Sequence, residues 1–247
     1  MIRPCYDSAR VTGAGSLDAP PPTNFREKLR LAPGLGLIFD LDGVIVDSMP
    51  FHRQAWQRYL EVSGIGTRES LEFMHGQRNE EIVRGLLGPG ADLETVIAHG
   101  AAKEQMYRDM LGERLGEHLV AGIAEWLAHV SGAPIALATN AERANVDFVL
   151  DGGKLRRYFQ AIVDGSEVER PKPAPDVYLR AAELLGIAAG NCIVFEDSPV
   201  GVAAAVAAGM RVVGVLTHGT ALDGVRFSIA NFLDSRLDTW LAAQRPG

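Results

Sequence analysis

Cysteine is scarce in this chain: only Cys5 and Cys192 occur among its 247 residues. Two cysteines cannot form the several cross-links of a disulfide-stapled fold, and they lack the paired spacing of a zinc site. Cys192 begins the apolar run CIVFED, so we expect a small buried side chain there. A chain of this length can bury a large hydrophobic core without such cross-links.

Long apolar runs are also absent. No uninterrupted apolar stretch reaches the roughly 20 residues that a membrane-spanning helix needs, so we expect no membrane partner. Residues 1–34 contain several Pro and Gly and lack the apolar core of a secretory signal. These absences favour a cytoplasmic protein that begins with an irregular extension at 1–34.

Basic residues are outnumbered, since 24 Lys and Arg stand against 31 Asp and Glu for a formal net charge of -7. No stretch of sequence forms a basic stripe, which argues against nucleic acid as a partner. With 47% hydrophobic and 22% charged residues, the composition is that of an ordinary globular protein. It does not indicate an oligomeric state.

Five short apolar runs have the character of buried parallel strands. They lie at residues 36–41, 133–139, 161–165, 192–197 and 211–217. Helical segments separate most of them, such as 176–187, which has an acid in its first turn and a glycine near its end. This alternation predicts an α/β fold with a doubly wound parallel sheet.

The segment between the first two predicted strands is too long for a single crossover helix. From about Met49 to Leu119 the pattern is helical and no strand is convincing. We therefore predict a helical cap at 49–119, inserted into a core that is made of 35–48 and 120–247.

Polar side chains follow the predicted strands where ligands bind in open parallel sheets, at the carboxyl ends. They comprise carboxylates, a hydroxyl, an amide and an ammonium group. In chain order these are Asp40, Asp42, Thr139, Asn140, Lys172, Glu196 and Asp197. Together such groups suit a divalent cation and a phosphate.

Four motifs, DLDGV, ATN, RPKPAPD and FEDS, contain these residues in that order. With them the chain resembles the haloacid dehalogenase superfamily, and within it the beta-phosphoglucomutase-like phosphatases, over about Leu37 to Leu216. The resemblance implies a Rossmann-like core with a mobile helical cap. It also implies Mg²⁺ as cofactor and a small phosphorylated metabolite as substrate.

The resemblance implies a role for each core residue. Asp40 is the nucleophile that forms an aspartyl-phosphate, because a carboxylate is ionised without help from a base. Asp42 is the general acid and base, and we expect neighbouring carboxylates to raise its pKa. Thr139 holds a phosphoryl oxygen, to which Asn140 can add an amide contact, and Lys172 offsets the negative charge. The alternatives are a loop-capping acid pair, a strand-end threonine bonded to local backbone and a surface lysine.

The metal ligands implied by the family pattern are the Asp40 carboxylate, the Asp42 backbone carbonyl and the Asp197 carboxylate. Glu196 joins them directly or through water. The alternative for Glu196 is an acid that stabilises the N-terminus of the following helix.

Three cap residues match substrate-binding positions of the beta-phosphoglucomutases: His52, Arg78 and Lys103. Each can contact sugar or phosphate oxygens. The alternative for Arg78 is a solvated arginine paired with Glu80 or Glu81, and for Lys103 an exposed helix lysine.

The loop after Thr139 reads Asn140-Ala141-Glu142-Arg143, which departs from the mutase pattern of serine, lysine and asparagine. Glu142 would repel a second phosphate, although Arg143 could offset it. The leading interpretation is therefore a Mg²⁺-dependent phosphatase, with sugar phosphates as the leading substrates. The alternatives are a beta-phosphoglucomutase-like phosphotransferase and a catalytically idle metabolite-binding module.

Overall fold

A six-stranded parallel sheet, in the order β3-β2-β1-β4-β5-β6, forms the centre of the protein. The computed structural model describes residues 28–67, 79–130, 132–219 and 221–247. The strands are β1 (Gly36–Phe39), β2 (Ile135–Ala138), β3 (Ala161–Val163), β4 (Cys192–Glu196), β5 (Arg211–Val215) and β6 (Phe227–Ile229). Five of them coincide with the predicted runs. β6 was not predicted, because its three residues include a serine and show too little apolar pattern.

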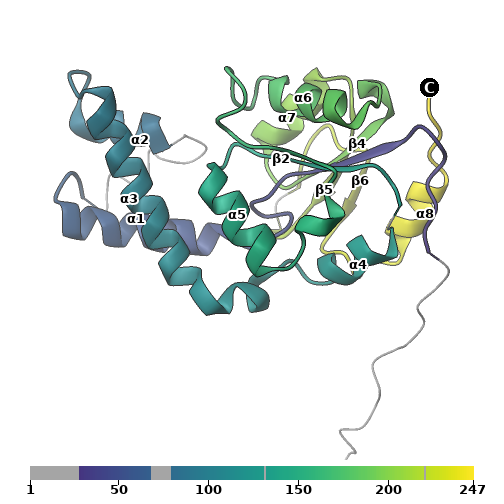
Figure 1. Cartoon of the computed structure of the whole chain (residues 1–247), viewed down its shortest axis with the longest axis horizontal. Helices are drawn as coiled ribbons and strands as arrows, with labels where there is room; N and C mark the ends of the chain where they lie inside the picture. The colour runs from purple at the N-terminus through teal and green to yellow at the C-terminus, as the bar shows by residue number, and fades with distance from the viewer. Residues whose placement is uncertain (1–27, 68–78, 131, 220) are drawn as a thin grey trace, which may run out of the picture.

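Helices cover both faces of this sheet (Figure 1). One face packs against α4 (Ile123–His129), α5 (Arg143–Gly152) and α8 (Arg236–Ala242), and the other against α6 (Asp176–Leu185) and α7 (Pro199–Ala207). Successive strand residues point to opposite faces, so Leu37 and Phe39 join the first core and Ile38 the second. The predicted doubly wound α/β fold is confirmed.

Three further helices lie beside the core as a separate layer, α1 (Met49–Ser63), α2 (Asn79–Leu87) and α3 (Leu93–Leu111) (Figure 1). They have a small apolar cluster of their own, which includes Trp56 and Val96. They follow β1 and precede β2, so the predicted helical insertion is confirmed, while the exact limits 49 and 119 stay a prediction.

The two chain segments that join this layer to the core lie side by side. Val46 bridges to Leu119, and the backbone amide of Asp47 donates to the carbonyl oxygen of His118 at 2.8 Å. The inserted helices are thus joined to the core through two adjacent connections.

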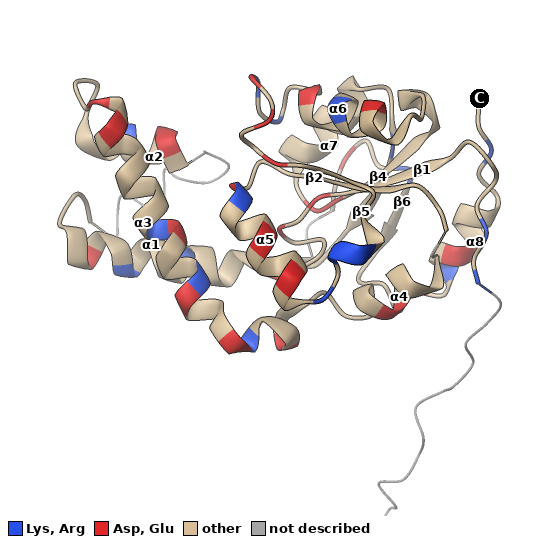
Figure 2. Cartoon of the chain, in the orientation of Figure 1, with Lys and Arg blue, Asp and Glu red and all other residues tan. Residues whose placement is uncertain are grey.

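Charged side chains of both signs are interspersed along the helices of the core and the cap (Figure 2). The excess of acidic residues is thus not confined to one element. Among the described residues, no helix is both long and apolar enough to cross a bilayer.

Candidate active site

The carboxyl ends of β1, β2 and β4 meet at one edge of the sheet, as the fold requires of parallel strands. Asp40 follows β1, Thr139 follows β2, and Glu196 is the last residue of β4. Lys172 reaches the same place from the loop between β3 and α6. All four are buried, with at most 7% of their surface exposed.

Lys172 lies at the centre of this cluster. Its Nζ donates to Asp40 Oδ1 at 2.7 Å and to Glu196 Oε1 at 2.8 Å. The same ammonium group lies over the ring of Tyr178, 4.6 Å from the centroid. Burial acts to lower the pKa of Lys172, but the charges of Asp40 and Glu196 outweigh it and raise that pKa to about 12. Lys172 is therefore a buried, charged lysine, and the surface-lysine alternative is wrong.

Glu196 is completely buried and uses both carboxylate oxygens within the protein. Oε1 accepts from Lys172 and from the Tyr178 hydroxyl at 2.7 Å. Oε2 accepts from the backbone amides of Asp197 and Ser198 and from the Ser198 hydroxyl. Burial opposes ionisation, but Lys172 outweighs it and lowers the pKa of Glu196. Glu196 thus binds Lys172 with Oε1 and the start of α7 with Oε2. The contact of Oε2 is the one expected of an acid that stabilises the N-terminus of the following helix.

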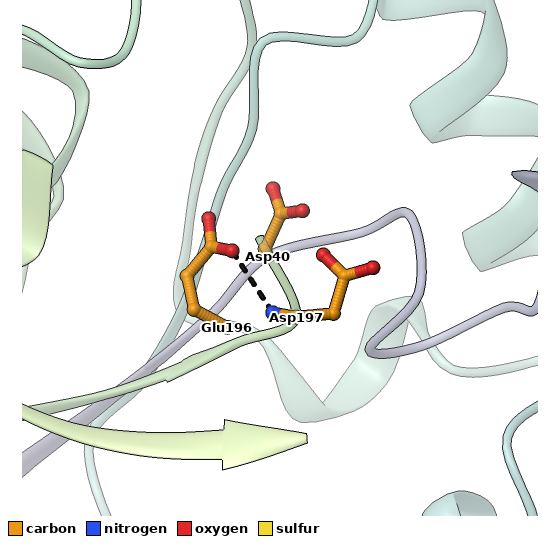
Figure 3. Close-up of side chains that lie close together, drawn as sticks. All are labelled: Asp40, Glu196 and Asp197. Atoms are coloured by element: carbon orange, nitrogen blue, oxygen red, sulfur yellow. Dashed lines mark hydrogen bonds between the residues drawn. The ribbon is translucent and has the colours of Figure 1, made fainter. Parts of the chain in front are cut away.

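Asp40, Glu196 and Asp197 each place a carboxylate oxygen within 4.8 Å of the others and could hold a metal ion (Figure 3). Burial raises the pKa of Asp40 to about 7, with Lys172 acting against it and Glu196 reinforcing it. Burial and the charge of Asp40 raise the pKa of Asp197 to about 8. When all three carboxyl groups are ionised, they carry more negative charge than the one lysine offsets. Hard oxygen donors of this kind suit Mg²⁺.

Gly43 is required by the position of Asp197. A Cβ atom at Gly43 would lie 1.8 Å from Asp197 Oδ2, and the backbone φ of +74° is one that side-chain-bearing residues rarely adopt. The glycine of the DLDGV motif therefore lets the first loop pass directly beneath the Asp197 carboxylate.

Asp42 faces the cap instead of the metal cluster. Ser48 Oγ donates to Asp42 Oδ1 at 2.5 Å, and His52 Nε2 lies 3.5 Å from the same oxygen. Burial acts to raise the pKa of Asp42, but the contacts with His52 and Ser48 outweigh it and lower that pKa. The raised pKa expected for Asp42 is therefore wrong in this arrangement, because the cap side supplies positive and hydrogen-bonding groups.

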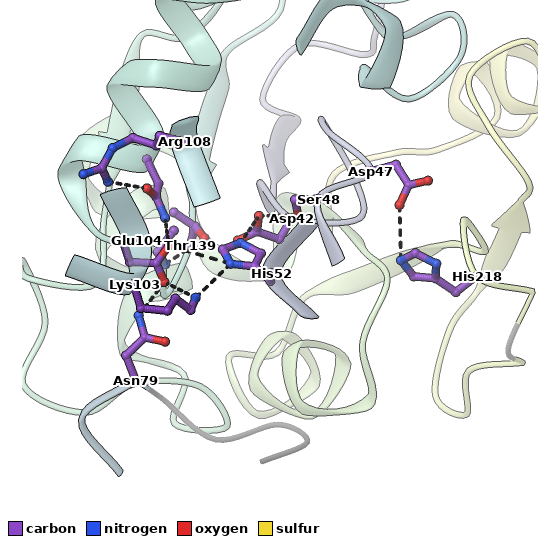
Figure 4. Close-up of polar contacts among 12 residues, drawn as sticks. Asp42, Asp47, Ser48, His52, Asn79, Lys103, Glu104, Arg108, Thr139 and His218 are labelled. Carbon is purple, nitrogen blue, oxygen red and sulfur yellow. Dashed lines mark hydrogen bonds and ion pairs between the residues drawn. The ribbon is translucent and has the colours of Figure 1, made fainter. Parts of the chain in front are cut away.

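Two of the three predicted cap residues join this contact (Figure 4). The His52 ring stacks on Tyr107 with centroids 3.9 Å apart, and His52 Nδ1 lies 3.0 Å from Lys103 Nζ. Lys103 is only 1% exposed and donates to Glu104 Oε1 at 2.7 Å. The exposed-lysine alternative for Lys103 is therefore wrong.

The second loop makes internal contacts. Thr139 Oγ1 accepts from the Ala141 amide at 3.1 Å, as the local-backbone alternative predicted. Asn140 Oδ1 accepts from the Lys172 amide at 3.1 Å and so fixes the loop that carries the lysine. Substrate contacts by Thr139 and Asn140 stay predictions. Arg78 lies outside the described residues.

Glu142 has a cationic partner from the cap. Arg108 Nη1 donates to Glu142 Oε1 at 2.5 Å. Arg143, which we considered as the compensating charge, instead donates to Asp147 at 2.9 Å and lies 3.7 Å from Asp164.

Sequence reasoning missed Ser48, Arg108 and Tyr178. Tyr178 follows the RPKPAPD motif by two residues, but its apolar helical register predicts a core residue and hides the hydroxyl bond to Glu196. Arg108 contacts a residue 34 positions away, which helical periodicity cannot detect.

Comparison with known proteins connects this geometry to one family. The haloacid dehalogenase-like hydrolases match residues 36–209. Protein CbbY of Rhodobacter capsulatus is 36% identical over 212 residues, which cover 79% of this chain and 90% of CbbY. The fructose-1-phosphate phosphatase YqaB of Escherichia coli is 35% identical over 185 residues, covering 73% of this chain and 95% of YqaB.

A solved structure supports the same connection. The beta-phosphoglucomutase of Clostridium difficile aligns with a TM-score of 0.71 at 25% identity, covering 84% of this chain and 96% of the mutase. The likeness therefore extends over both the sheet and the inserted helices.

Proposed function

Because this chain belongs to the haloacid dehalogenase-like hydrolase family, we propose that it is a Mg²⁺-dependent phosphatase of small sugar monophosphates, with Asp40 as the nucleophile. The observation that carries the proposal is the contact of Lys172 with Asp40, next to Asp197. The E. coli relative, a fructose-1-phosphate phosphatase, supports a phosphorylated sugar as substrate.

The first step uses Asp40 and Lys172. The Asp40 carboxylate attacks phosphorus, and the bond from phosphorus to the sugar oxygen breaks. The Lys172 ammonium, 2.7 Å from Asp40, stabilises the negative charge on the phosphoryl oxygens during transfer. Asp40 and Asp197 would hold Mg²⁺, and the bound ion would supply positive charge that this acidic cluster lacks.

Asp42 is the proposed acid and base. A substrate dianion entering the site raises the pKa of a nearby carboxyl group, which opposes the lowering by His52 and Ser48. Asp42 then carries the proton that it gives to the leaving sugar oxygen. In the second step it takes a proton from water, which attacks the aspartyl-phosphate and releases phosphate.

Mg²⁺ affinity is expected to rise steeply with pH. Burial raises the pKa of Asp40 to about 7 and of Asp197 to about 8, so protons compete with the metal below these values. Calorimetric titration of metal-free protein should show binding at least about tenfold tighter at pH 8 than at pH 6. Equal affinity at both pH values would contradict the assignment of these two ligands.

Thermal unfolding gives a second measurement of the same effect. The carboxyl pKa values are higher in the folded protein than in the unfolded chain, so these groups favour the metal-free fold most below about pH 4. That contribution to the free energy of unfolding is lost as the pH rises to about 8. Mg²⁺ binds the ionised carboxylates, so its stabilising shift in Tm should be larger at pH 8 than at pH 6. In Asp197→Asn, both the shift and its pH dependence should shrink.

The phosphatase proposal is tested by product analysis. We expect free phosphate from at least one sugar monophosphate in a panel that includes beta-glucose 1-phosphate with a trace of the 1,6-bisphosphate. Glu142 engages Arg108 and Asp147 engages Arg143, so neither guanidinium group is available to a second phosphate, and we expect little glucose 6-phosphate. Stoichiometric glucose 6-phosphate without free phosphate would instead establish a mutase. No turnover of any ester would favour the binding module.

A further inference from the structure

We propose that Arg108 and Glu104 of the cap, with Glu142 and Asn145 of the core, form a cap–core latch that holds the cap closed and governs productive binding of substrates large enough to touch it. This inference rests on the proposed phosphatase function. It assigns positioning roles to four residues that stand outside the motifs of the core site.

The first half of the latch is an ion pair between α3 and the start of α5. Arg108 Nη1 donates to Glu142 Oε1 at 2.5 Å and to Asn145 Oδ1 at 2.7 Å. Its other nitrogen, Nη2, donates to Gln105 Oε1 at 2.9 Å, which orients the guanidinium group from its own helix. The Arg108 side chain is only 15% exposed, so its charge is partly shielded from solvent.

The second half is buried. Asn145 is 3% exposed, and its Nδ2 donates to Glu104 Oε2 at 2.8 Å. The other oxygen of Glu104 accepts from Lys103 at 2.7 Å and from Asn79, both in the cap. Opening the cap would remove the core donor from a buried carboxylate, which is unfavourable unless water replaces it. Both Arg108 and Glu104 therefore lose partners when the cap leaves α5.

These contacts have the position that a latch needs. The cap is joined to the core through adjacent connections at 46–47 and 118–119. The contacts of Arg108 and Glu104 with the core involve neither connection. Because hydrogen bonds are directional, these contacts form in only one position of the cap relative to the core. They therefore distinguish a closed arrangement from an open one, and a closed cap excludes water from the reaction.

A kinetic test compares a sugar monophosphate with acetyl phosphate, which is too small to depend on the cap. Arg108→Gln and Glu142→Gln should each lower kcat/KM for the sugar phosphate about tenfold, with acetyl phosphate hydrolysis within about twofold of wild type. The charge-swapped Arg108→Glu/Glu142→Arg variant should recover much of the loss. Arg143→Gln is the matched control and should behave like wild type, because the partners of this neighbouring cation among the described residues, Asp147 and Asp164, both belong to the core.

A distance measurement reports the latch without turnover. Spin labels at Ile97 on α3 and Leu179 on α6 use two exposed positions, in a Cys5→Ser background where Cys192 is buried. Wild type should give one narrow distance distribution. Arg108→Gln should broaden it toward longer distances, and Arg143→Gln should not. Melting temperatures of all variants identify any that fail to fold.

The outcomes separate the two proposals. A protein that hydrolyses no phosphate ester, yet loses the narrow distribution in Arg108→Gln, would contradict the phosphatase and support the latch. Unchanged distributions in Arg108→Gln and Glu142→Gln would overturn the latch, whatever the enzyme hydrolyses. So would equal losses on both substrates, or a charge swap that recovers nothing, because those results place the residues in the chemistry or in the fold.

Discussion

Asp40→Asn is expected to lose at least about a thousandfold in kcat, because the amide cannot attack phosphorus. The substitution keeps the size of the side chain and removes a carboxyl group that burial makes costly to ionise. Lys172 keeps its contact with Glu196 at 2.8 Å, so the cluster is not left with an unpaired cation. We therefore expect a melting temperature equal to or above that of wild type.

Steady-state release of phosphate from a sugar monophosphate, with Mg²⁺ in excess, measures this loss. Acid-quenched wild-type enzyme should carry phosphate on Asp40 during turnover, and the variant should carry none. Arg156→Gln is a control, because the side-chain partners of Arg156 among the described residues are Asp147 and Asp151 on the core surface. Turnover by Asp40→Asn near the wild-type rate would contradict the aspartyl-phosphate intermediate.

Lys172→Met is expected to reduce both stability and activity. Methionine fills a similar volume but leaves the buried carboxylates of Asp40 and Glu196 without the cation that contacts both. Breaking a buried ion pair from one side costs about 3–5 kcal/mol of unfolding free energy. Denaturant unfolding without metal should show this loss, and phosphate release should fall to background.

Two further variants separate charge from packing at Lys172. Tyr178→Phe keeps the ring beneath the ammonium group and removes only the bond to Glu196, so it should cost about 1 kcal/mol. Lys172→Met/Glu196→Gln removes one of the unpaired charges and should recover part of the stability but none of the activity. A Lys172→Met protein as stable as wild type would contradict the stabilising role of the buried lysine. Retained turnover would contradict its role in phosphoryl transfer.

Local sequence pattern was sufficient to predict five of the six strands, the helical insertion and the polar residues at the strand ends. Buried parallel strands are continuous apolar runs, so β1 and β4 could be located from the sequence, and the length of 49–119 excluded a single crossover. Because carboxyl ends of parallel strands share one edge, Asp40 and Glu196 could be brought together before any contact was known.

Contacts between distant segments lay beyond that reasoning, because periodicity describes each element alone. The direction of the Asp42 pKa depends on Ser48 and His52 facing it from the cap side, and neighbouring carboxylates in the sequence suggested the opposite. The sequence suggested that Glu142 repels a second phosphate. In the structure Arg108, 34 residues away in the chain, forms an ion pair with Glu142 and offsets its charge. Charge and hydrogen bonding in a buried site depend on which elements pack together, and only the folded arrangement of cap and core specifies that.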